Sequence, residues 1–305
     1  MKSVNVDMLV KNYGTKKAVV HAVRGVSFEV DKGEIFGIIG PDGAGKTSLF
    51  RMLVTLLLPD GGTATVDGSD IVKDFKAIRN KVGYMPGRFS LYQDLTVAEN
   101  MNFFATIFNT SIEENYDLVK DIYSQIEPFK KRRAGKLSGG MKQKLALSCA
   151  LIHRPVVLFL DEPTTGVDAV SRKEFWEMLK RLKEQGITIL VSTPYMDEAG
   201  LCDRVALMQE GKLLSVGTPQ KITGAFKHTI LAVKSENMFQ LLKDIKAFPD
   251  VQDCYSFGEY HHATMKEGYD EEKLKQYLGQ KGHKQIEVKE VQPNIEDCFM
   301  QLMKN

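Results

Sequence analysis

A glycine-rich stretch, GPDGAGKT at Gly40–Thr47, has the spacing of a phosphate-binding loop. It matches G-x-x-x-x-G-K-[ST], follows the apolar run IFGII and precedes the helix-like TSLFRMLVTLLL, which is the setting that the motif requires. Its glycines let the backbone wrap around an anion, so that N–H groups and a helix N-terminus face phosphate. Lys46 is expected to reach the β- and γ-phosphates, and Thr47 to ligate Mg²⁺. The residues predicted to contact nucleotide here are Gly40, Pro41, Asp42, Gly43, Ala44, Gly45, Lys46, Thr47 and Ser48.

Two adjacent carboxylates follow the fully apolar run VVLFL at 156–160. A run of this kind is typical of a strand inside a parallel sheet, and its carboxyl end lies at the edge where phosphate loops also lie. Asp161 is predicted to hold Mg²⁺, directly or through water. Glu162 is predicted to polarise the water that attacks the γ-phosphate. The expected catalytic residues of an ATP-hydrolysing site are therefore Glu162 and Lys46.

The segments around these residues alternate between strand-like and helix-like patterns over the first 225 residues. The runs IFGII, VGYM, VVLFL, ITILV and RVALM have the composition of buried strands, and a helix is predicted over 170–185. This alternation predicts an α/β core with a largely parallel sheet. A mostly helical insertion is predicted at about 88–150.

The pattern changes near residue 226. Six segments from HTILAVKS to KQIEVKEV follow the order β-α-β-β-α-β, which is the ferredoxin-like arrangement, and the amphipathic NIEDCFMQLMK closes the sequence. We therefore expect a nucleotide-binding domain over 1–225 and a small α+β accessory or regulatory domain over 226–305.

Composition limits the classes of function. The 305 residues are 43% hydrophobic and 26% charged, and the formal net charge of +2 does not by itself indicate a nucleic-acid partner. The four cysteines (149, 202, 254 and 298) show no CxxC spacing, and no signal peptide is recognised, so a reduced, cytoplasmic protein is expected. No apolar run approaches the roughly 18–20 residues of a membrane-spanning helix. Any membrane role is therefore expected to come through a partner.

The stretch LSGGMKQK at Leu137–Lys144 resembles the signature sequence of the ATP-binding cassette (ABC) ATPases. Its occurrence together with GPDGAGKT and FLDEP strengthens this resemblance, which covers about residues 1–220. The resemblance implies a P-loop NTPase fold, with a RecA-like core, an antiparallel β subdomain and the helical insertion. It also implies that Ser138, Gly139 and Gly140 contact the γ-phosphate of ATP held by an opposite protomer, in a dimer with two composite sites.

Two further positions match the family pattern. Tyr13, in KNYG, corresponds to the aromatic residue that stacks on adenine, although an isolated surface tyrosine would look the same. Asp168, in TTGVDAVSR, corresponds to the aspartate of a loop that communicates across the dimer.

Two positions depart from the family pattern. Family members usually carry glutamine where this sequence has Gly87, and often histidine where it has Pro194. Gln93 lies too far along to replace the glutamine directly, and Arg88 is read either as a phosphate contact or, more simply, as a solvent-facing cation. Pro194 suits the start of a helix over YMDEA, with Thr193 as its cap, but provides no donor to phosphate.

The two departures predict that ATP binding is intact and that hydrolysis is slow. Loss of one preorganised donor typically costs on the order of 10²–10³ in rate, and such losses rarely add. A homodimer is the simpler expectation. The alternative is an asymmetric heterodimer, in which this sequence supplies an intact signature to a partner with complete switch residues.

The resemblance also bears on what the ATPase serves. The tail VQPNIEDCFMQLM is similar to that of ATPase subunits of type-2 (ABC-2) exporters, and GYMPxRFSLYxDLTVAEN to a branch linked to membrane-fusion proteins. An ABC-2 type permease is thus the implied partner, and the inner face of the cell membrane the implied location. The residues Phe103, Phe104, Ile107 and Phe108 either line the groove for the permease or form ordinary helix core. A soluble, non-transport ATPase is the alternative; the basic run at 129–136 is interpreted as a solvated loop, and no nucleic-acid partner is expected.

Overall fold

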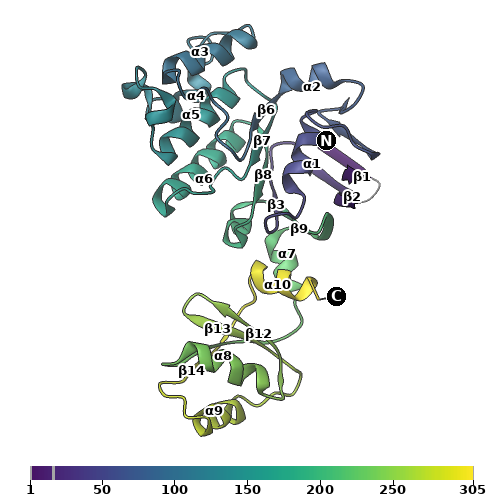
Figure 1. Cartoon of the computed structure of the whole chain (residues 1–305), viewed down its shortest axis with the longest axis vertical. Coiled ribbons are helices and arrows are strands. Elements are labelled where there is room, and N and C mark those ends of the chain that lie inside the picture. Colours follow the sequence, from purple (N-terminus) through teal and green to yellow (C-terminus); the bar gives the residue numbers. More distant parts are fainter. Residues whose placement is uncertain (1, 16–17, 305) are drawn as a thin grey trace. The chain divides into compact units, whose positions relative to one another are not determined.

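The computed structural model describes residues 2–15 and 18–304, which divide into two compact units, Met1–Pro219 and Gln220–Asn305 (Figure 1). The first unit is built on a six-stranded sheet with the order β10-β9-β3-β8-β7-β6, in which only β10 runs antiparallel to its neighbour. The strands are β3 (Ile35–Ile39), β6 (Val82–Met85), β7 (Val157–Asp161), β8 (Thr188–Thr193), β9 (Arg204–Gln209) and β10 (Lys212–Gly217).

The central strands of this sheet are apolar because helices cover the sheet. Every residue of β3, β7 and β8 is buried, as expected for parallel strands with both faces covered. Helix α1 (Lys46–Leu53) packs against the sheet through an edge-to-face contact of Phe50 with Phe159, whose ring centroids lie 5.6 Å apart. Helix α6 (Ala169–Glu184) buries Trp176, the single tryptophan of the chain. The predicted α/β core is confirmed.

A second sheet with the order β2-β1-β4-β5 is antiparallel throughout. Its strands are β1 (Lys2–Thr15), β2 (Ala18–Asp31), β4 (Gly61–Val66) and β5 (Ser69–Asp70), and α2 (Phe75–Lys81) follows it. Buried and exposed residues alternate along the last part of β2, so one face of the sheet contributes to the core and the other meets solvent. This is the antiparallel β subdomain that the resemblance implied.

The helical insertion comprises α3 (Val97–Ile107), α4 (Tyr116–Tyr123), η1 (Glu127–Phe129), η2 (Ala134–Lys136) and α5 (Gly139–Leu151). The start of α3 is fixed by a capping box, in which the Thr96 hydroxyl accepts from the Glu99 N–H and the Glu99 carboxylate accepts from the Thr96 N–H. In Figure 1 these helices form a group to one side of the strands, and α5 leads back to β7.

The second unit contains one four-stranded antiparallel sheet with the order β12-β13-β11-β14. Its elements are α7 (Pro219–Gly224), β11 (Ile230–Lys234), α8 (Met238–Ala247), β12 (Val251–Phe257), β13 (Tyr260–Met265), α9 (Glu271–Gln280), β14 (Glu287–Val291) and α10 (Ile295–Leu302). The β-α-β-β-α-β order and this strand order confirm the ferredoxin-like arrangement. The unit has its own core, centred on Leu231, Leu241 and Leu274.

Candidate nucleotide-binding site

The predicted phosphate loop connects the carboxyl end of β3 to α1, and its shape depends on two glycines. A Cβ on Gly40 would lie 2.1 Å from the Met208 carbonyl oxygen, and one on Gly45 would lie 2.1 Å from that of Ala22. Gly45 also has a φ of 105°, a conformation that residues with side chains rarely adopt. The loop backbone is therefore held close to its neighbours, and the N–H groups that begin α1 are left to face an anion.

Lys46 lies at the first position of α1 with only 3% of its surface exposed. Its ammonium donates to the carbonyl oxygens of Gly40 (2.8 Å) and Pro41 (3.0 Å) and forms an ion pair with Glu162 Oε1 at 3.1 Å. A buried cation needs such partners. The loop carbonyls and the carboxylate thus keep this charge at the place where phosphate is predicted to bind.

A set of oxygen atoms converges on Asp161 at the end of β7. The Thr47 hydroxyl donates to Asp161 Oδ1 at 3.2 Å, and the Ser192 hydroxyl donates to the same oxygen at 2.6 Å. Burial raises the pKa of Tyr84 to about 12, and the negative charge of Asp161 adds to this rise. Thr47 and Asp161 offer the hard oxygen ligands that Mg²⁺ prefers.

The composition of this cluster fits Mg²⁺ held together with phosphate. Among the described residues, no group of three or more His, Cys, Asp or Glu side chains could hold a metal ion. Mg²⁺ typically uses one or two carboxylates and completes its coordination with water and substrate phosphates. Asp161 and Thr47 match that pattern.

Glu162 has a φ of 50°, a left-handed conformation that is uncommon for a residue other than glycine. Its N–H donates to the Ser192 carbonyl at 3.0 Å and lies 3.1 Å from the Ser192 hydroxyl. Gly87 is a close neighbour, because a Cβ there would lie 3.0 Å from the Asp161 carbonyl oxygen and 3.6 Å from Glu162 Cβ. Position 87 is thus beside the backbone of Asp161 and the Cβ of Glu162, and its residue has no side chain.

Ser192 was not predicted as a site residue. It is fully buried at the end of β8 and contacts both Asp161 and Glu162. The available signal was a polar residue in the strand ITILVST, where every preceding residue but one is apolar.

Tyr13 lies beside the loop, with its hydroxyl 3.1 Å from the Ser48 hydroxyl on α1. The residue is 39% exposed, so part of its ring faces solvent next to the loop. A ring in this place can offer a flat face to a nucleotide base.

The predicted signature residues lie at the N-terminus of α5, where they contact α6. Ser138 is the N-cap residue and accepts from the Met141 N–H at 3.4 Å. A Cβ on Gly140 would lie 3.0 Å from the Ser171 hydroxyl oxygen. Asp168 caps α6 by accepting from the N–H groups of Val170 and Ser171, and these bonds, that of Ser171 foremost, lower the pKa of its carboxyl group. Ser138, Gly140 and Asp168 therefore belong to two adjoining helix starts.

The segment after β8 differs from the prediction in one respect. The helix expected to begin at Pro194 with Thr193 as its cap is a 3-10 helix, η3 (Met196–Leu201), whose N-cap residue Tyr195 is extended. The Thr193 hydroxyl instead accepts from the Tyr195 N–H at 3.0 Å. The Gly40 N–H donates to the Thr193 carbonyl at 3.2 Å, so Pro194 directly follows a residue bonded to the phosphate loop.

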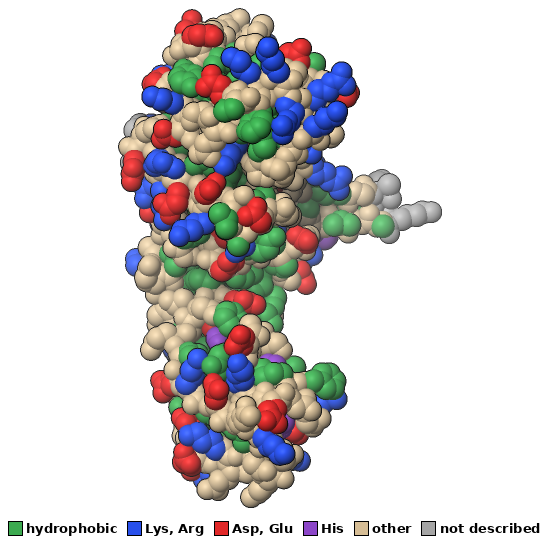
Figure 2. Space-filling model, turned by 90° about the vertical axis from the view of Figure 1, so that its left-hand side faces the viewer, with side chains coloured by type: hydrophobic (Ala, Val, Ile, Leu, Met, Phe, Trp, Pro, Cys, Tyr) green, Lys and Arg blue, Asp and Glu red, His purple; other side chains and the backbone are tan. Residues whose placement is uncertain are grey.

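Three of the four predicted groove residues lie on α3, and Phe108 directly follows it. Phe104 is half-buried, with its ring centroid 5.4 Å from that of Phe103. Phe103 (37% exposed) and Ile107 (54%) are at the surface, and the ring centroid of Phe103 lies 4.8 Å from that of Tyr92. Phe108 instead stacks on His153 at 3.8 Å, and is therefore part of the packing of the helical insertion. Figure 2 shows hydrophobic side chains exposed among charged ones on the face that carries these helices.

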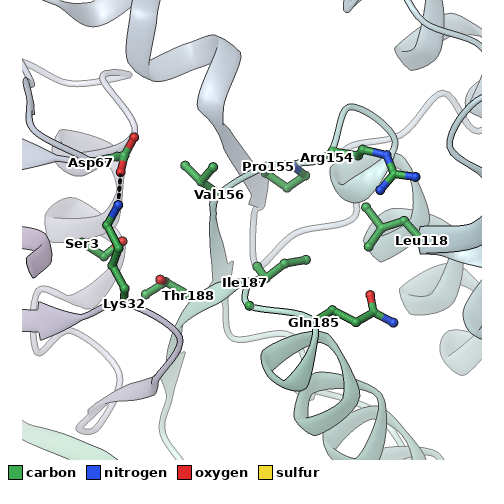
Figure 3. Close-up of a pocket in the computed structure, with 11 residues that line it drawn as sticks. Ser3, Lys32, Asp67, Leu118, Arg154, Pro155, Val156, Gln185, Ile187 and Thr188 are labelled. Carbon is green, nitrogen blue, oxygen red and sulfur yellow. Dashed lines mark hydrogen bonds and ion pairs between the residues drawn. The ribbon is translucent and has the colours of Figure 1, made fainter. Parts of the chain in front are cut away.

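A hollow of about 290 Å³ lies at the other edge of the parallel sheet, before β7 and β8 begin (Figure 3). Lys32 lies at one side of it and pairs with Asp67 at 3.1 Å, while Arg154 lies at the opposite side and pairs with Asp117. Both cations already have carboxylate partners. The phosphate loop lies at the carboxyl edge of the sheet, so this hollow is separate from the candidate nucleotide site.

Comparison with known proteins agrees with the resemblance. The family model of the ABC transporter matches residues 23–165. The chain is 40% identical over 286 residues to the probable multidrug ABC transporter ATP-binding protein YbhF of Escherichia coli (strain K12), covering 92% of this chain and 49% of that protein. It thus spans about half the length of that relative.

For two further similar proteins, the match covers most of their length. The Nod factor export ATP-binding protein I of Rhizobium sp. (strain N33) is 34% identical over 308 residues, which cover 99% of this chain and 98% of that protein. A dimeric post-hydrolysis structure of the ATP-binding cassette MJ0796, bound to ADP and Pi, is 25% identical with a TM-score of 0.64, covering 70% of this chain and 98% of that one.

Proposed function

The chain belongs to the ABC transporter family of ATP-binding proteins, and we propose on this basis that it is the subunit that binds Mg²⁺–ATP to drive export through a separate membrane permease. The observation that carries the proposal is the convergence of Lys46, Thr47, Asp161 and Glu162 at one edge of the sheet. When bound, Mg²⁺ would neutralise charge on the β- and γ-phosphates. Tyr13, beside Ser48, would stack on the adenine.

Glu162 and Lys46 exchange partners in the proposed cycle. Lys46 is paired with Glu162 at 3.1 Å and would give up this carboxylate for phosphate oxygens. Glu162 would then be free to orient the attacking water, while its N–H stays bonded to the Ser192 carbonyl. The ion pair thus places the cation proposed to bind phosphate beside the carboxylate proposed to orient water.

A dimer completes the proposed site. Ser138, Gly139 and Gly140 begin α5 and would present the helix N-terminus to the γ-phosphate held by a second nucleotide-binding domain. The dimeric form of the related cassette structure supports this assignment. ATP at both sites would favour the closed dimer, and hydrolysis would reopen it.

The permease would bind the helical insertion, where Phe103, Ile107 and Tyr92 are exposed. None of the described helices is long and apolar enough to cross a membrane. The chain would then be held at the inner face of the cell membrane by an ABC-2 type permease, in an exporter that also includes a membrane-fusion protein. The names of the relatives, a multidrug protein and a Nod factor exporter, support export as the direction of transport.

We further propose that the chain hydrolyses ATP slowly. Gly87 lies beside Asp161 and Glu162 without a side chain, and Pro194 provides neither a side-chain donor nor an N–H. Binding depends on other groups, so ATP affinity would be retained. The intact signature could then serve a partner with complete switch residues, which is the asymmetric alternative to a homodimer.

The experiment is to measure ATP affinity and turnover of purified wild-type protein and of Gly87→Gln/Pro194→His. We expect similar affinity and a gain in turnover on the order of 10²-fold in the double variant. Pro194→Ala is the matched control, because it restores the backbone N–H without adding a side-chain donor, and it should give no gain. Fast turnover by the wild type, unchanged in the double variant, would contradict attenuation and leave the ATPase assignment in place.

A further inference from the structure

Glu198 is a buried carboxylate on η3 that the nucleotide site does not account for. Only 2% of its side chain is exposed, and among the described residues neither carboxylate oxygen has a hydrogen-bond partner. A buried charge is costly unless another charge lies near it. The cation near it is Arg172, whose Nε lies 3.9 Å from Glu198 Oε1.

Arg172 makes two more contacts with the same segment. Its Nη2 donates to Asp197 Oδ2 at 2.9 Å, and its guanidinium carbon lies 5.1 Å from the centroid of the Tyr195 ring. One side chain of α6 therefore contacts three residues of the four-residue stretch that follows Pro194. We call Arg172, Tyr195, Asp197 and Glu198 the α6–η3 clamp. Arginine suits this role, because its planar fork can pair with carboxylates and lie over a ring at the same time.

Each end of the clamp reaches a functional group. On α6, Arg172 follows Ser171, which contacts Gly140 of the signature and donates its N–H to Asp168. On the other side, Tyr195 donates its N–H to Thr193, whose carbonyl accepts from the Gly40 N–H of the phosphate loop. The clamp thus connects the residues predicted to meet the partner protomer with the residues around this chain's own phosphate site.

We infer that Arg172 is a positioning residue that fixes the segment 193–198 against α6, and through it the approach of Ser192 and Glu162 to bound nucleotide. The clamp is more important for placing this segment because Pro194 has no side-chain donor that could bind the γ-phosphate. The segment is then placed by its packing on α6 rather than by contact with nucleotide. This inference rests on the proposed ATPase function for its kinetic consequence, but its structural part stands independently.

The test compares Arg172→Met with Arg172→Lys in the full chain. We expect amide hydrogen exchange over residues 193–201 to accelerate at least about tenfold in Arg172→Met, while α1 and β7 stay protected. The turnover number for ATP should fall about tenfold with little change in KM, because the segment acts on orientation rather than on binding. Arg172→Lys, which keeps the charge, should recover part of both effects.

Two further variants separate positioning from simple charge compensation. Among the residues that the structure describes, Lys180 of the same helix pairs only with the exposed Glu177, so Lys180→Met should leave exchange and turnover unchanged. Arg172→Met should also lower the melting temperature, because it leaves the buried Glu198 carboxylate without a counter-charge. Arg172→Met/Glu198→Gln removes that carboxylate, so the melting temperature should recover while fast exchange and low turnover remain. If the double variant regains wild-type exchange and turnover, Arg172 is only a counter-charge and the inference is overturned.

The two proposals fail in different ways. Wild-type protein without ATPase activity, combined with accelerated exchange in Arg172→Met, would contradict the proposed function and support the clamp. Normal exchange and normal turnover in Arg172→Met would contradict the clamp and leave the proposed function in place. Emission of Trp176, one turn from Arg172 on α6, gives a second structural readout that does not depend on turnover.

Discussion

Ser192 bonds both acidic residues of the candidate site, through the carboxylate of Asp161 and the backbone N–H of Glu162. Its hydroxyl donates to Asp161 Oδ1 at 2.6 Å and lies 3.1 Å from the Glu162 nitrogen, and its carbonyl accepts from the same N–H. Because Asp161 is buried, the carboxylate depends on such donors for its placement. A single serine therefore affects both the predicted Mg²⁺ ligand and the predicted general base.

Ser192→Ala should lower the free energy of unfolding by about 1–3 kcal/mol, since it leaves a buried carboxylate oxygen without one donor. The same change should weaken Mg²⁺-dependent ATP binding, because Asp161 loses its orientation. Chemical denaturation with and without Mg²⁺–ATP measures both effects. Ser192→Thr keeps the hydroxyl and is the matched control. Unchanged stability in Ser192→Ala would show that the 2.6 Å bond contributes nothing to folding.

The start of α6 shows how one residue can carry a structural and a functional role. Asp168 accepts hydrogen bonds from the N–H groups of Val170 and Ser171, and it is also the residue predicted to communicate across the dimer. Asp168→Ala should lower the melting temperature by roughly 2–4 °C through loss of the cap. Asp168→Asn keeps a capping oxygen and should melt like the wild type. Differential scanning calorimetry distinguishes the two, and equal losses in both variants would assign the effect to charge instead of capping.

In the C-terminal unit, Ser235, Asp244 and His283 form a group of hydrogen-bonded polar side chains beside the end of β11. His283 Nε2 lies 2.9 Å from Asp244 Oδ2, and His283 Nδ1 lies 3.3 Å from the Ser235 hydroxyl. The Gln240 amide, together with the His283 ring, holds the pKa of Asp244 below its usual value. A depressed carboxyl pKa stabilises the fold above the unfolded value, near pH 4, and this stabilisation is lost as the pH falls through the folded value.

We therefore expect the stability of the C-terminal unit to fall as the pH drops below about 4, and the fall to be smaller in Asp244→Asn. Circular dichroism at a series of pH values measures the transition. Lys273→Gln is a control on the neighbouring α9, because its partner Asp270 is exposed. If wild type and Asp244→Asn lose stability equally as the pH falls, Asp244 does not contribute to the acid dependence.

Elements and motifs that are contiguous in the sequence were predictable, and pairings between distant segments were not. The phosphate loop and the DE pair could be read from GPDGAGKT and VVLFLDEP, since each carries its own local pattern. The contacts of Arg172 with η3 join segments about 25 residues apart in sequence and carry no local signal. The predicted helix start at Pro194 was wrong, because Tyr195 is extended and donates its N–H to the Thr193 hydroxyl.

At the scale of the whole molecule, two separate cores suggest two separable folding units. The first core gathers residues of both N-terminal sheets, including Phe36, Phe50 and Phe159, and the second is confined to residues after 230. The second unit, Gln220–Asn305, is much the smaller, and a small domain buries a lower fraction of its surface on folding. It is therefore expected to be the less stable of the two.

The four cysteines report on the two units independently. Cys149 and Cys202 belong to the first unit and Cys254 and Cys298 to the second, and all four are buried. Burial raises the pKa of each thiol, to about 12 for Cys254 and about 11 for Cys298, so the native protein should resist alkylation at neutral pH. In increasing denaturant we expect Cys254 and Cys298 to be alkylated first, as measured by peptide mass spectrometry.

Mg²⁺–ATP should shift only the later of these two transitions. A ligand at 100 times its Kd stabilises the unit that binds it by about 2.7 kcal/mol, and the candidate site lies wholly within the first unit. Protection of Cys149 and Cys202 should therefore extend to higher denaturant, while the midpoint for Cys254 and Cys298 stays fixed. Lys46→Ala should abolish the shift, because it removes the cation expected to hold phosphate. If all four thiols react in one transition that ATP moves as a whole, the two units unfold as a single cooperative body.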